Sequence, residues 1–556
     1  MKPTHILLTL VLIILVASTV VYSHKNRNSE ILSATELTSF EDYASLRAKV
    51  MSEYNYPNYE IVVLFNLSLE KSILGVKGNM VEQISFSNLI LNEPIWVEIY
   101  IPEKVHLNSV QFSHINILKS VCYKEWCLLL INPLSKDGAV TFNYSFRFSF
   151  TEQNEDAPFN DPYYTSIKRE KIALPLSLAS IGINSATTAW KVSFLLFKTP
   201  WEDAKAFLIV NQTLIPLTVG EKRVIPTPQN SQFLLFAGRF KEITGNTTQG
   251  ITIRVYYPLD EVFEIFPGEV LNWSKDVIST YVYLYSIVPS GNYYIINWNT
   301  GKAKGNGFLD GIIVGMWSAK GDVGLNKMLM AHELAHSWFG GYADFGVLNE
   351  ALATFSDLYV ENKFGENWYS VAEDKALYGD NTPIVKITKN VPEYQHILYY
   401  KGALIFRSLQ FILGNETFFE GLRELLNECH GKECNLTDVQ AVFENVSGRN
   451  LNWFFKEWFY STKVPNYDVR NLKLDQKGGK YFLNFEIIDK NNFTMPLEVK
   501  VLTSRGRIIK KVWVAGNVEV SFELEDKPLK IILDPNEWMV NINRREKIDD
   551  IEVVIE

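Results

Sequence analysis

Histidine and cysteine are scarce in this sequence, and concentrated positive charge is absent. The 556 residues include only eight histidines and four cysteines, and the formal net charge is −9. Because the balance is acidic and no basic stripe occurs, nucleic acid is not expected as a partner. The chain also contains no internal repeat and no low-complexity segment. What is present is the composition of a globular protein, 47% hydrophobic and 13% aromatic, at a length that predicts several domains.

The four cysteines form two local pairs of identical spacing, Cys122/Cys127 and Cys429/Cys434. Such a short interval between partners suits a small loop closed by a disulfide, which is typical of an oxidising compartment. The alternative is one four-cysteine metal site, which would require the two distant pairs to meet. Of these two interpretations the disulfides are favoured.

The N-terminus carries an apolar run, residues 6–22, after the basic start Met1-Lys2. Its length is near the lower limit for a bilayer-spanning helix and in the upper range for a signal-peptide core. Residues 1–24 are therefore expected to be a single-pass membrane anchor, or a signal that is removed. Either one places the remaining chain outside the cytoplasm, and Asn-x-Ser/Thr sequons along the chain agree with that location. The anchor is favoured, although the flanking positive charges do not fix its orientation.

Beyond this segment, changes in apolar periodicity divide the chain. Residues 25–53 are polar and predict a stalk that becomes helical, while residues 54–245 contain alternating aromatic and β-branched runs that predict a β domain. Residues 246–466 become strongly helical, and strand-like runs return in residues 467–556. The predicted fold class is multidomain α+β: an N-terminal β domain, an α-rich domain and a small C-terminal β domain. Helices are expected at residues 325–339, 347–363, 400–413, 416–427, 436–446 and 451–460.

The rare histidines form the most informative motif, His332-Glu333-Leu334-Ala335-His336. Two histidines four apart lie about 40° apart around a helix, so both imidazoles can reach one ion. Glu333 is about 100° away from His332 and therefore stands beside the ion, where it can act as a base. Good helix formers precede the motif, and Gly340-Gly341 follows it, as expected at a helix end. The alternative, a chance occurrence, is rare in a chain with so few histidines.

A third ligand is expected from a second helix. Glu350 follows His336 after thirteen intervening residues, within Leu348-Asn349-Glu350-Ala351-Leu352-Ala353. We expect one zinc ion held by His332, His336 and Glu350, because three protein ligands leave the fourth position open for water, as in catalytic zinc sites. Asp357 lies two helical turns after Glu350 on the same face. It is a candidate partner for a liganding histidine, with a solvated aspartate as the alternative.

The segment from His332 to about Val469 resembles the membrane alanyl aminopeptidase family, gluzincin zinc peptidases that include leukotriene A4 hydrolase-like enzymes. Residues 332–340 are similar to the family's zinc-binding segment, and residues 348–355 to the segment with the third ligand. Tyr399-Tyr400-Lys401-Gly402-Ala403 matches the family's Tyr-x-Lys-Gly pattern. The resemblance implies a thermolysin-like catalytic domain followed by a β-sandwich. It also implies that Tyr399 assists catalysis as a donor to the developing oxyanion.

Two departures from the family pattern concern segments around the motif. The connection from His336 to Glu350 is about five residues shorter than in the family, which a loop deletion explains without moving either helix. The family also carries Gly-x-Met-Glu-Asn before the first histidine, and its glutamate binds the free amine of the substrate. Gly305-Asn306-Gly307-Phe308-Leu309-Asp310-Gly311 stands there in this chain. Because Phe308 replaces the glutamate, Gly307 and Asp310 are the candidate substrate-binding residues, with a plain turn aspartate as the alternative.

Together these features predict a cell-surface zinc metallopeptidase that cleaves peptides in an aminopeptidase-like manner. Glu333 is expected to take a proton from zinc-activated water and to deliver it to the departing amine. A zinc endopeptidase or oligopeptidase is the first alternative, because the amine-binding residue is altered. An inactive binding or structural module of the cell envelope is the second, and the presence of both Glu333 and Tyr399 argues against it. Side-chain specificity and oligomeric state cannot be inferred from the sequence.

Overall fold

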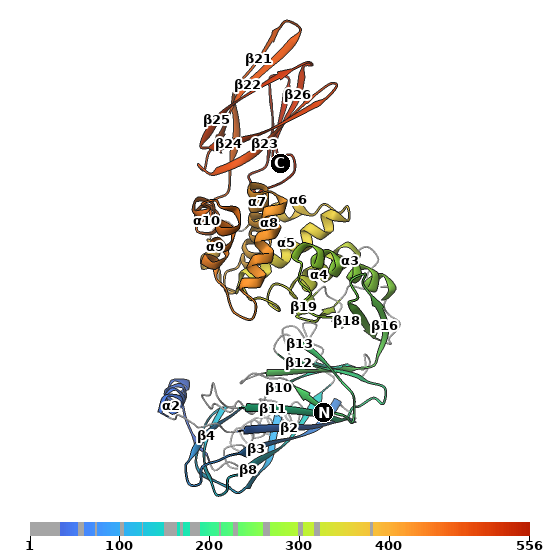
Figure 1. Cartoon of the computed structure of the whole chain (residues 1–556), viewed down its shortest axis with the longest axis vertical. Helices are drawn as coiled ribbons and strands as arrows, with labels where there is room; N and C mark the ends of the chain where they lie inside the picture. Colours follow the sequence, from blue (N-terminus) through green and yellow to red (C-terminus); the bar gives the residue numbers. More distant parts are fainter. Residues whose placement is uncertain are drawn as a thin grey trace, which may run out of the picture. The chain divides into compact units, whose positions relative to one another are not determined.

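A computed structural model of the chain shows two compact units (Figure 1). The first unit holds most of residues 1–242, and the second holds most of residues 243–556. The predicted membrane segment, residues 1–24, lies outside the described residues. No helix in the described part of the chain is both long and apolar enough to cross a membrane. The structure describes residues 34–53, 60–72, 75–100, 105–124, 126–149, 164–166, 171–177, 189–210, 213–225, 232–258, 267–297, 304–315, 323–378 and 382–556.

The first unit is built from β-sheets, as the alternating pattern predicts. Its described strands have the orders β1-β6-β7-β4, β13-β12-β15-β10-β9 and β14-β11-β2-β3-β8-β5. On β2 the alternate residues Val63, Phe65, Leu67 and Leu69 are all buried in the core of this unit. The strands are β1 (Thr35–Glu36), β2 (Glu60–Ser72), β3 (Gly75–Ser87), β4 (Ile95–Tyr100), β5 (Val105–Ser113), β6 (Ile115–Tyr123), β7 (Trp126–Pro133), β8 (Gly138–Ser149), β9 (Tyr164–Ser166), β10 (Lys171–Ser177), β11 (Ala189–Lys198), β12 (Lys205–Val210), β13 (Thr213–Leu217), β14 (Lys222–Ile225) and β15 (Gln232–Gly238).

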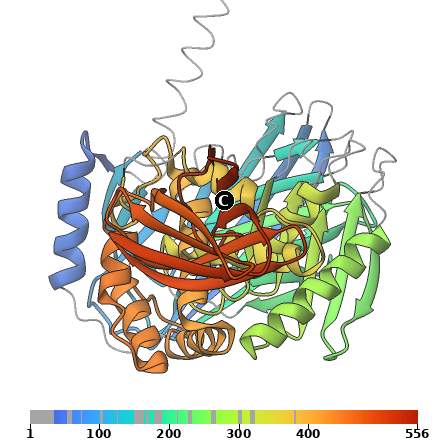
Figure 2. The same ribbon diagram turned by 90° about the horizontal axis from the view of Figure 1, so that it is seen from above.

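The described part of the predicted stalk packs onto this unit. Helix α2 (Phe40–Glu53) is drawn in blue in Figures 1 and 2. It buries Tyr43 and Val50 in a small cluster with Trp96 and Leu128. The Tyr43 hydroxyl donates a 2.7 Å hydrogen bond to the buried carboxylate of Glu98. Aromatic packing and this buried bond therefore attach α2 to the sheet that contains β4 and β7.

The second unit begins with a mixed sheet of order β16-β17-β18-β20-β19. Its strands are β16 (Phe240–Asn246), β17 (Thr252–Pro258), β18 (Asn292–Asn297), β19 (Lys304–Phe308) and β20 (Gly311–Gly315). Helix α3 (Pro267–Tyr285) enters between β17 and β18, and its Tyr281 hydroxyl donates to the carbonyl of Ala331 at 2.9 Å. Strand β19 pairs with β20 and ends this order, so it forms the edge of the described sheet.

The helical region follows, and most of its helices agree with the predicted ranges. Helices α4 (Val323–Ala335) and α5 (Leu348–Lys363) carry the motif residues, and the π-helix η2 (His396–Lys401) leads into α7 (Gly402–Leu413). The sequence predicted an α-helix through residue 339, but α4 ends at Ala335. Tighter turns, in which each amide bonds to the carbonyl three residues before it, follow at residues 336–338. The remaining helices are α6 (Tyr369–Ala376), η1 (Ile384–Lys386), α8 (Asn415–Glu428), α9 (Leu436–Ser447) and α10 (Asn452–Phe459).

The last strands form a sheet of order β21-β22-β25-β24-β23-β26-β28-β27, shown in red in Figure 2. Strands β24 and β25 pair only through Ala515 and Asn517, which divides this sheet into a three-stranded and a five-stranded part. One continuous hydrophobic core runs from the helices into these strands, so both belong to the same unit. The strands are β21 (Tyr467–Lys477), β22 (Lys480–Asp489), β23 (Thr494–Thr503), β24 (Arg507–Ala515), β25 (Asn517–Leu524), β26 (Pro528–Leu533), β27 (Arg544–Ile548) and β28 (Ile551–Ile555).

Both predicted disulfides are present. Cys122–Cys127 joins adjacent strands of the β6–β7 hairpin in the first unit. Cys429–Cys434 closes the loop between α8 and α9 in the second unit. The two bonds therefore have the same sequence separation but very different surroundings, and the four-cysteine metal site is excluded.

Candidate active site

The histidine motif lies at the C-terminal end of α4. His332 is in the last turn of the helix, and His336 follows it in a further turn closed by a hydrogen bond from its amide to the Glu333 carbonyl. Both imidazole Nε2 atoms face one carboxylate oxygen, Oε2 of Glu350, at 3.2 Å for His332 and 3.4 Å for His336. The ligand-type atoms of these three side chains all lie within 4.8 Å of one another. The structure thus brings together the three residues that the sequence predicted as zinc ligands.

The opposite nitrogen of each imidazole is fixed by a hydrogen bond. Nδ1 of His336 lies 2.9 Å from the Phe339 carbonyl oxygen, which can only accept, so this nitrogen carries the hydrogen. Nδ1 of His332 lies 3.0 Å from Oδ2 of Asp357, which is buried. Both rings are therefore oriented with Nε2 towards Glu350. Outer hydrogen bonds of this kind are usual for metal-binding histidines.

Charge and burial act against each other in this cluster. Burial opposes ionisation of His332, but hydrogen bonds to the carboxylates of Asp357 and Glu350 outweigh it and hold the pKa of His332 well above its usual value. Burial likewise favours the neutral form of Glu350, yet the two imidazoles keep its pKa well below its usual range. Burial raises the pKa of Asp357 to about 6 despite the hydrogen bond with His332. A divalent cation would compete with the proton on His332 for the same carboxylate.

Glu350 is in the first turn of α5, where the helix dipole stabilises a carboxylate. The next turn of this helix carries Thr354, whose hydroxyl is 3.4 Å from Nδ1 of His332, and the turn after that carries Asp357. Because α5 and α4 lie side by side, one face of α5 supplies a ligand and two groups that contact His332. The sequence reasoning missed Thr354, although its position four residues after Glu350 could have indicated it.

Glu333 is buried beside strand β19. A hydrogen bond from the backbone amide of Gly307 reaches its carboxylate, while burial is the main cause of its raised pKa. A Cβ atom at Gly305 would lie 2.5 Å from Oε1 of Glu333, and one at Gly307 would lie 2.6 Å from Cβ of His336. These two positions therefore need glycine, because any side chain would displace the motif residues. Gly307 thus contacts Glu333 directly, and its predicted role in binding substrate stays a prediction.

Asp310 has a different environment. It is buried in the turn between β19 and β20, where its backbone carbonyl accepts a 2.9 Å hydrogen bond from the amide of Tyr294. Burial is the main cause of the raised pKa of Tyr293, and the negative charge of Asp310 raises that pKa further. Phe308, which stands where the family has glutamate, is also buried. The predicted role of Asp310 in binding substrate stays a prediction.

Tyr399 comes from η2 and lies directly over the first ligand. Its ring stacks on the His332 imidazole with a centroid distance of 5.6 Å and an interplanar angle of 13°. Burial and a hydrogen bond with Glu350 raise its pKa well above the usual value, so it remains a phenol that can donate. Tyr394 packs edge-on against Tyr399 at 6.3 Å, and no motif in the sequence indicated it.

The Lys-Gly that follows Tyr399 and Tyr400 has a structural explanation. The buried Lys401 side chain donates to the Thr462 carbonyl at 3.0 Å. A Cβ atom at Gly402 would lie 2.7 Å from Cβ of Ala351, the residue after Glu350. Glycine therefore permits the close approach of α7 and α5 that places Tyr399 beside Glu350. A π-turn of this kind is frequently found at functional sites.

The donor set fits a zinc ion. Two imidazole nitrogens and one carboxylate oxygen converge, the other nitrogen of each imidazole is hydrogen-bonded, and a buried carboxylate lies beside them. This combination of ligands is one of the common sets of catalytic zinc sites. His332, His336 and Glu350 would hold the ion, and Glu333 and Tyr399 would flank it.

Comparison with known proteins supports the family resemblance. The peptidase family M1 domain matches residues 315–458, which include His332, Glu333, His336, Glu350 and Tyr399. Tricorn protease-interacting factor F2 of Thermoplasma acidophilum is 25% identical over 343 residues, covering 56% of this chain and 42% of that protein. A protein named probable aminopeptidase 2, from Sulfurisphaera tokodaii, is 24% identical over 356 residues, covering 57% and 44% respectively. The chain therefore resembles the M1 aminopeptidases as a divergent relative, and the M1 domain itself accounts for residues 315–458.

A solved aminopeptidase structure has a similar fold over a longer range. Aminopeptidase A of Legionella pneumophila, determined with aspartic acid, superposes with a TM-score of 0.56 at 18% identity. The match covers 89% of this chain and 61% of that chain, so the M1 likeness includes β-rich and helical regions alike. The chain spans less than half the length of the curated M1 relatives named above. The family resemblance predicted from the motifs is confirmed.

Proposed function

We propose that this chain is a zinc-dependent metallopeptidase that cleaves peptides in an aminopeptidase-like manner outside the cytoplasm. The observation that carries the proposal is the convergence of His332, His336 and Glu350 within 4.8 Å, with a buried acid beside them. Membership of the M1 family supports peptide bonds as the substrate. A bound zinc ion would supply the Lewis acid that polarises the scissile carbonyl and acidifies water.

Two side chains beside the ligands have separate chemical roles, one in proton transfer and one in stabilising negative charge. The Glu333 carboxylate, whose pKa burial raises, can accept a proton from the attacking water and return it to the leaving amine. Tyr399 keeps its proton because its pKa lies well above the usual value, so its hydroxyl can donate to the carbonyl oxygen as negative charge develops there. The two groups therefore have different roles: Glu333 accepts a proton, and Tyr399 donates a hydrogen bond.

Strand β19 can hold the peptide next to these groups. It forms the edge of the described sheet, and its Gly305 and Gly307 lie against Glu333. An extended peptide can add to such an edge through main-chain hydrogen bonds. Because glycine leaves no side chain between strand and helix, this arrangement brings a scissile bond close to Glu333.

The preference for the N-terminal end of a peptide is the part of the proposal that has an alternative. Phe308 occupies the position at which the family resemblance places an amine-binding glutamate, and its ring is buried. An endopeptidase or oligopeptidase is therefore the second candidate. Cleavage rates of one peptide with a free and with an acetylated N-terminus separate the two, because an aminopeptidase rejects the blocked form and an endopeptidase accepts both.

Zinc analysis of the purified protein combined with a peptide-library digest read by mass spectrometry tests the proposal. We expect one zinc per chain and cleavage products that disappear in the Glu333→Gln variant. Protein that holds zinc but cleaves no peptide would favour the inactive envelope module instead. Protein without zinc and without activity would remove the proposal altogether.

The location rests on residues 1–24 and on the two disulfides. Membrane fractionation, followed by protease treatment of intact cells, tests it. An anchored extracytoplasmic enzyme stays with the membrane and is cut from outside, whereas a secreted form appears in the medium. A protein found only in the cytoplasm would contradict the proposal.

A further inference from the structure

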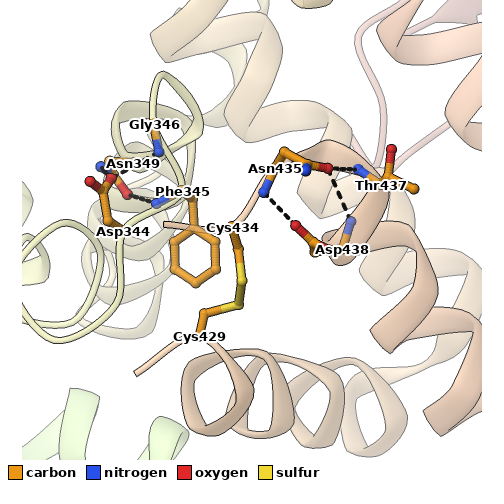
Figure 3. The surroundings of a disulfide bond; sticks show 9 residues. All are labelled: Asp344, Phe345, Gly346, Asn349, Cys429, Cys434, Asn435, Thr437 and Asp438. Carbon is orange, nitrogen blue, oxygen red and sulfur yellow. Dashed lines mark hydrogen bonds between the residues drawn. A yellow bond between two sulfur atoms is a disulfide. The ribbon is translucent and has the colours of Figure 1, made fainter. Parts of the chain in front are cut away.

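The shortened connection between the second histidine and Glu350 is held by a distant part of the chain. We call residues 337–347 the connector and residues 429–434, closed by the Cys429–Cys434 bond, the disulfide loop (Figure 3). The connector joins the end of α4 to the start of α5, so it lies between two ligand-bearing helices. Nothing in the helix pattern of either segment indicates that they meet.

Backbone hydrogen bonds join the connector to the disulfide loop. The Cys434 amide donates to the Asp344 carbonyl at 2.7 Å, and the Gly431 amide donates to the Tyr342 carbonyl at 3.3 Å. The His430 ring stacks on Tyr342 with a centroid distance of 4.0 Å, and its Nδ1 lies 3.1 Å from the same carbonyl. Isolated β-bridges also pair Ala343 with His430 and Asp344 with Glu433. Within the described residues no named strand forms a ladder with the connector, so the disulfide loop acts as its short pairing partner.

The contact continues from the connector into α5. Asp344 Oδ1 accepts hydrogen bonds from the Gly346 amide at 2.9 Å and from Asn349 Nδ2 at 2.7 Å. Asn349 Oδ1 in turn accepts from the Phe345 amide at 2.9 Å, as Figure 3 shows. Asn349 immediately precedes Glu350. A chain of direct contacts thus runs from Cys434 through Asp344 and Asn349 to the third ligand.

The disulfide loop connects two helices. Helix α8 ends at Glu428, just before Cys429, and α9 begins at Leu436 after a capping box formed by Asn435 and Asp438 (Figure 3). Cys429 and Cys434 are both buried. The bond between them fixes the loop where the two helix ends meet, so the loop can resist movement of the connector.

We propose that the disulfide loop is a positioning element for the metal site, which orients Glu350 through Asp344 and Asn349. This inference rests on the proposed function, because it concerns how firmly the site holds zinc. The physical reason is the length of the connector: a short connection with no strand neighbour needs an external partner to keep its backbone in one conformation. Breaking the bond releases that partner, so the third ligand samples other orientations and the ion leaves faster.

The test measures zinc release by a chelator from the full-length protein. The Cys429→Ser/Cys434→Ser variant is compared with wild type and with Cys122→Ser/Cys127→Ser, a matched control with the same spacing in the β6–β7 hairpin. We expect release to accelerate about tenfold or more in the first variant and to stay at the wild-type rate in the control. Circular dichroism confirms that each variant is folded.

A second pair of variants tests the same path without touching the disulfide. Asp344→Ala removes the acceptor for Gly346 and Asn349, whereas Asp344→Asn retains an oxygen that can accept from both. We expect faster zinc release from Asp344→Ala and recovery in Asp344→Asn, which a general loss of stability would not produce. This pair decides the question if the Cys429→Ser/Cys434→Ser variant does not fold.

The outcomes separate this inference from the proposed function. Suppose that wild-type protein holds zinc, and that folded Cys429→Ser/Cys434→Ser and Asp344→Ala release it at the wild-type rate. This result overturns the positioning role of the disulfide loop and leaves the proposed peptidase function intact. Equal acceleration in the Cys122→Ser/Cys127→Ser control would also overturn it, because the effect would not depend on the connector. Wild-type protein that binds no zinc removes the proposed function and this inference with it.

Discussion

Two clusters of carboxyl groups in the second unit have different partners. In the site cluster, Glu350 and Asp357 face the imidazoles of His332 and His336. In the second cluster, at the junction of helices and C-terminal strands, Glu373 accepts a 2.9 Å hydrogen bond from the Asn541 amide. We call this second group, Glu373 and Asp534, the junction cluster.

The partners explain what each cluster can do. Asp534 of the junction cluster accepts from the amides of Trp538 and Met539 at 3.0 and 3.1 Å, and burial raises its pKa to about 7. Backbone amides can neither release a proton at ordinary pH nor bind a cation, so these acids hold a loop in place. Imidazoles can do both. A buried acid is therefore evidence of a site only when its partners can exchange protons or metal.

The contrast between the site cluster and the junction cluster predicts that substitution of Glu333 has the largest effect on activity. Glu333→Gln keeps the shape of the side chain but removes the proton acceptor, so kcat should fall by about 10² to 10⁴. Zinc content should stay at the wild-type value, because Glu333 is not among the converging ligands. Steady-state kinetics and metal analysis on the same preparation measure both. Wild-type activity in this variant would show that another group takes the proton.

Tyr399→Phe is expected to have the next largest effect. The ring can still stack on His332, but the hydroxyl that would stabilise the oxyanion is lost, and kcat should fall by about 10² to 10³. KM should change far less than kcat, since the donor is needed mainly as charge develops. A variant that changes KM alone would place Tyr399 in substrate binding rather than in the chemical step.

Asp357 should influence how tightly the metal is held. Asp357→Asn leaves an acceptor of similar size for Nδ1 of His332 but removes the negative charge, and zinc affinity should fall by about 10-fold to 100-fold. Competition with a chelator of known affinity measures the change. Affinity equal to wild type would assign Asp357 to packing alone.

The smallest effect on activity is expected in the junction cluster, where pH should act on stability instead. Burial raises the pKa of Glu373 to about 8, so between about pH 4.5 and 8 the folded chain binds a proton there that the unfolded chain has lost. Stability therefore falls with rising pH in this window, by up to about 1.4 kcal/mol per pH unit for one such group. Glu373→Gln removes this loss, so it should stabilise the protein more at pH 8 than at pH 5.

Thermal unfolding at the two pH values measures that difference, and activity of Glu373→Gln should remain within about twofold of wild type. Equal changes in midpoint at pH 5 and pH 8 would show that Glu373 is ionised in the folded chain at both. A large loss of activity would mean that the junction cluster is coupled to the site, and the contrast between the two clusters would fail.

Much of this site could be predicted because its residues are close in sequence or in helical register. His332, His336 and Asp357 follow from spacing along single helices, and the Glu350 ligand follows from one short connection. The predicted helix at residues 436–446 is α9 (Leu436–Ser447), because its capping residues and apolar period agree. Local rules therefore account for most helices and for the metal ligands.

What could not be predicted depends on contacts between distant segments. The π-helix that carries Tyr399 leads into Gly402, which packs closely against Ala351, and no period in the sequence encodes that approach. The early end of α4 at Ala335 depends on the connector, whose pairing partner lies nearly ninety residues away in the disulfide loop. The position of Asp310, in a turn beside Tyr294, likewise depends on the pairing of β18 with β20.

Crystallography of the purified protein with anomalous data at the zinc absorption edge tests the metal assignment most directly. We expect a single peak in contact with Nε2 of His332, Nε2 of His336 and a carboxylate oxygen of Glu350. A well-ordered crystal with no peak there, or with the Glu350 carboxylate turned away from both imidazoles, would contradict the proposed peptidase.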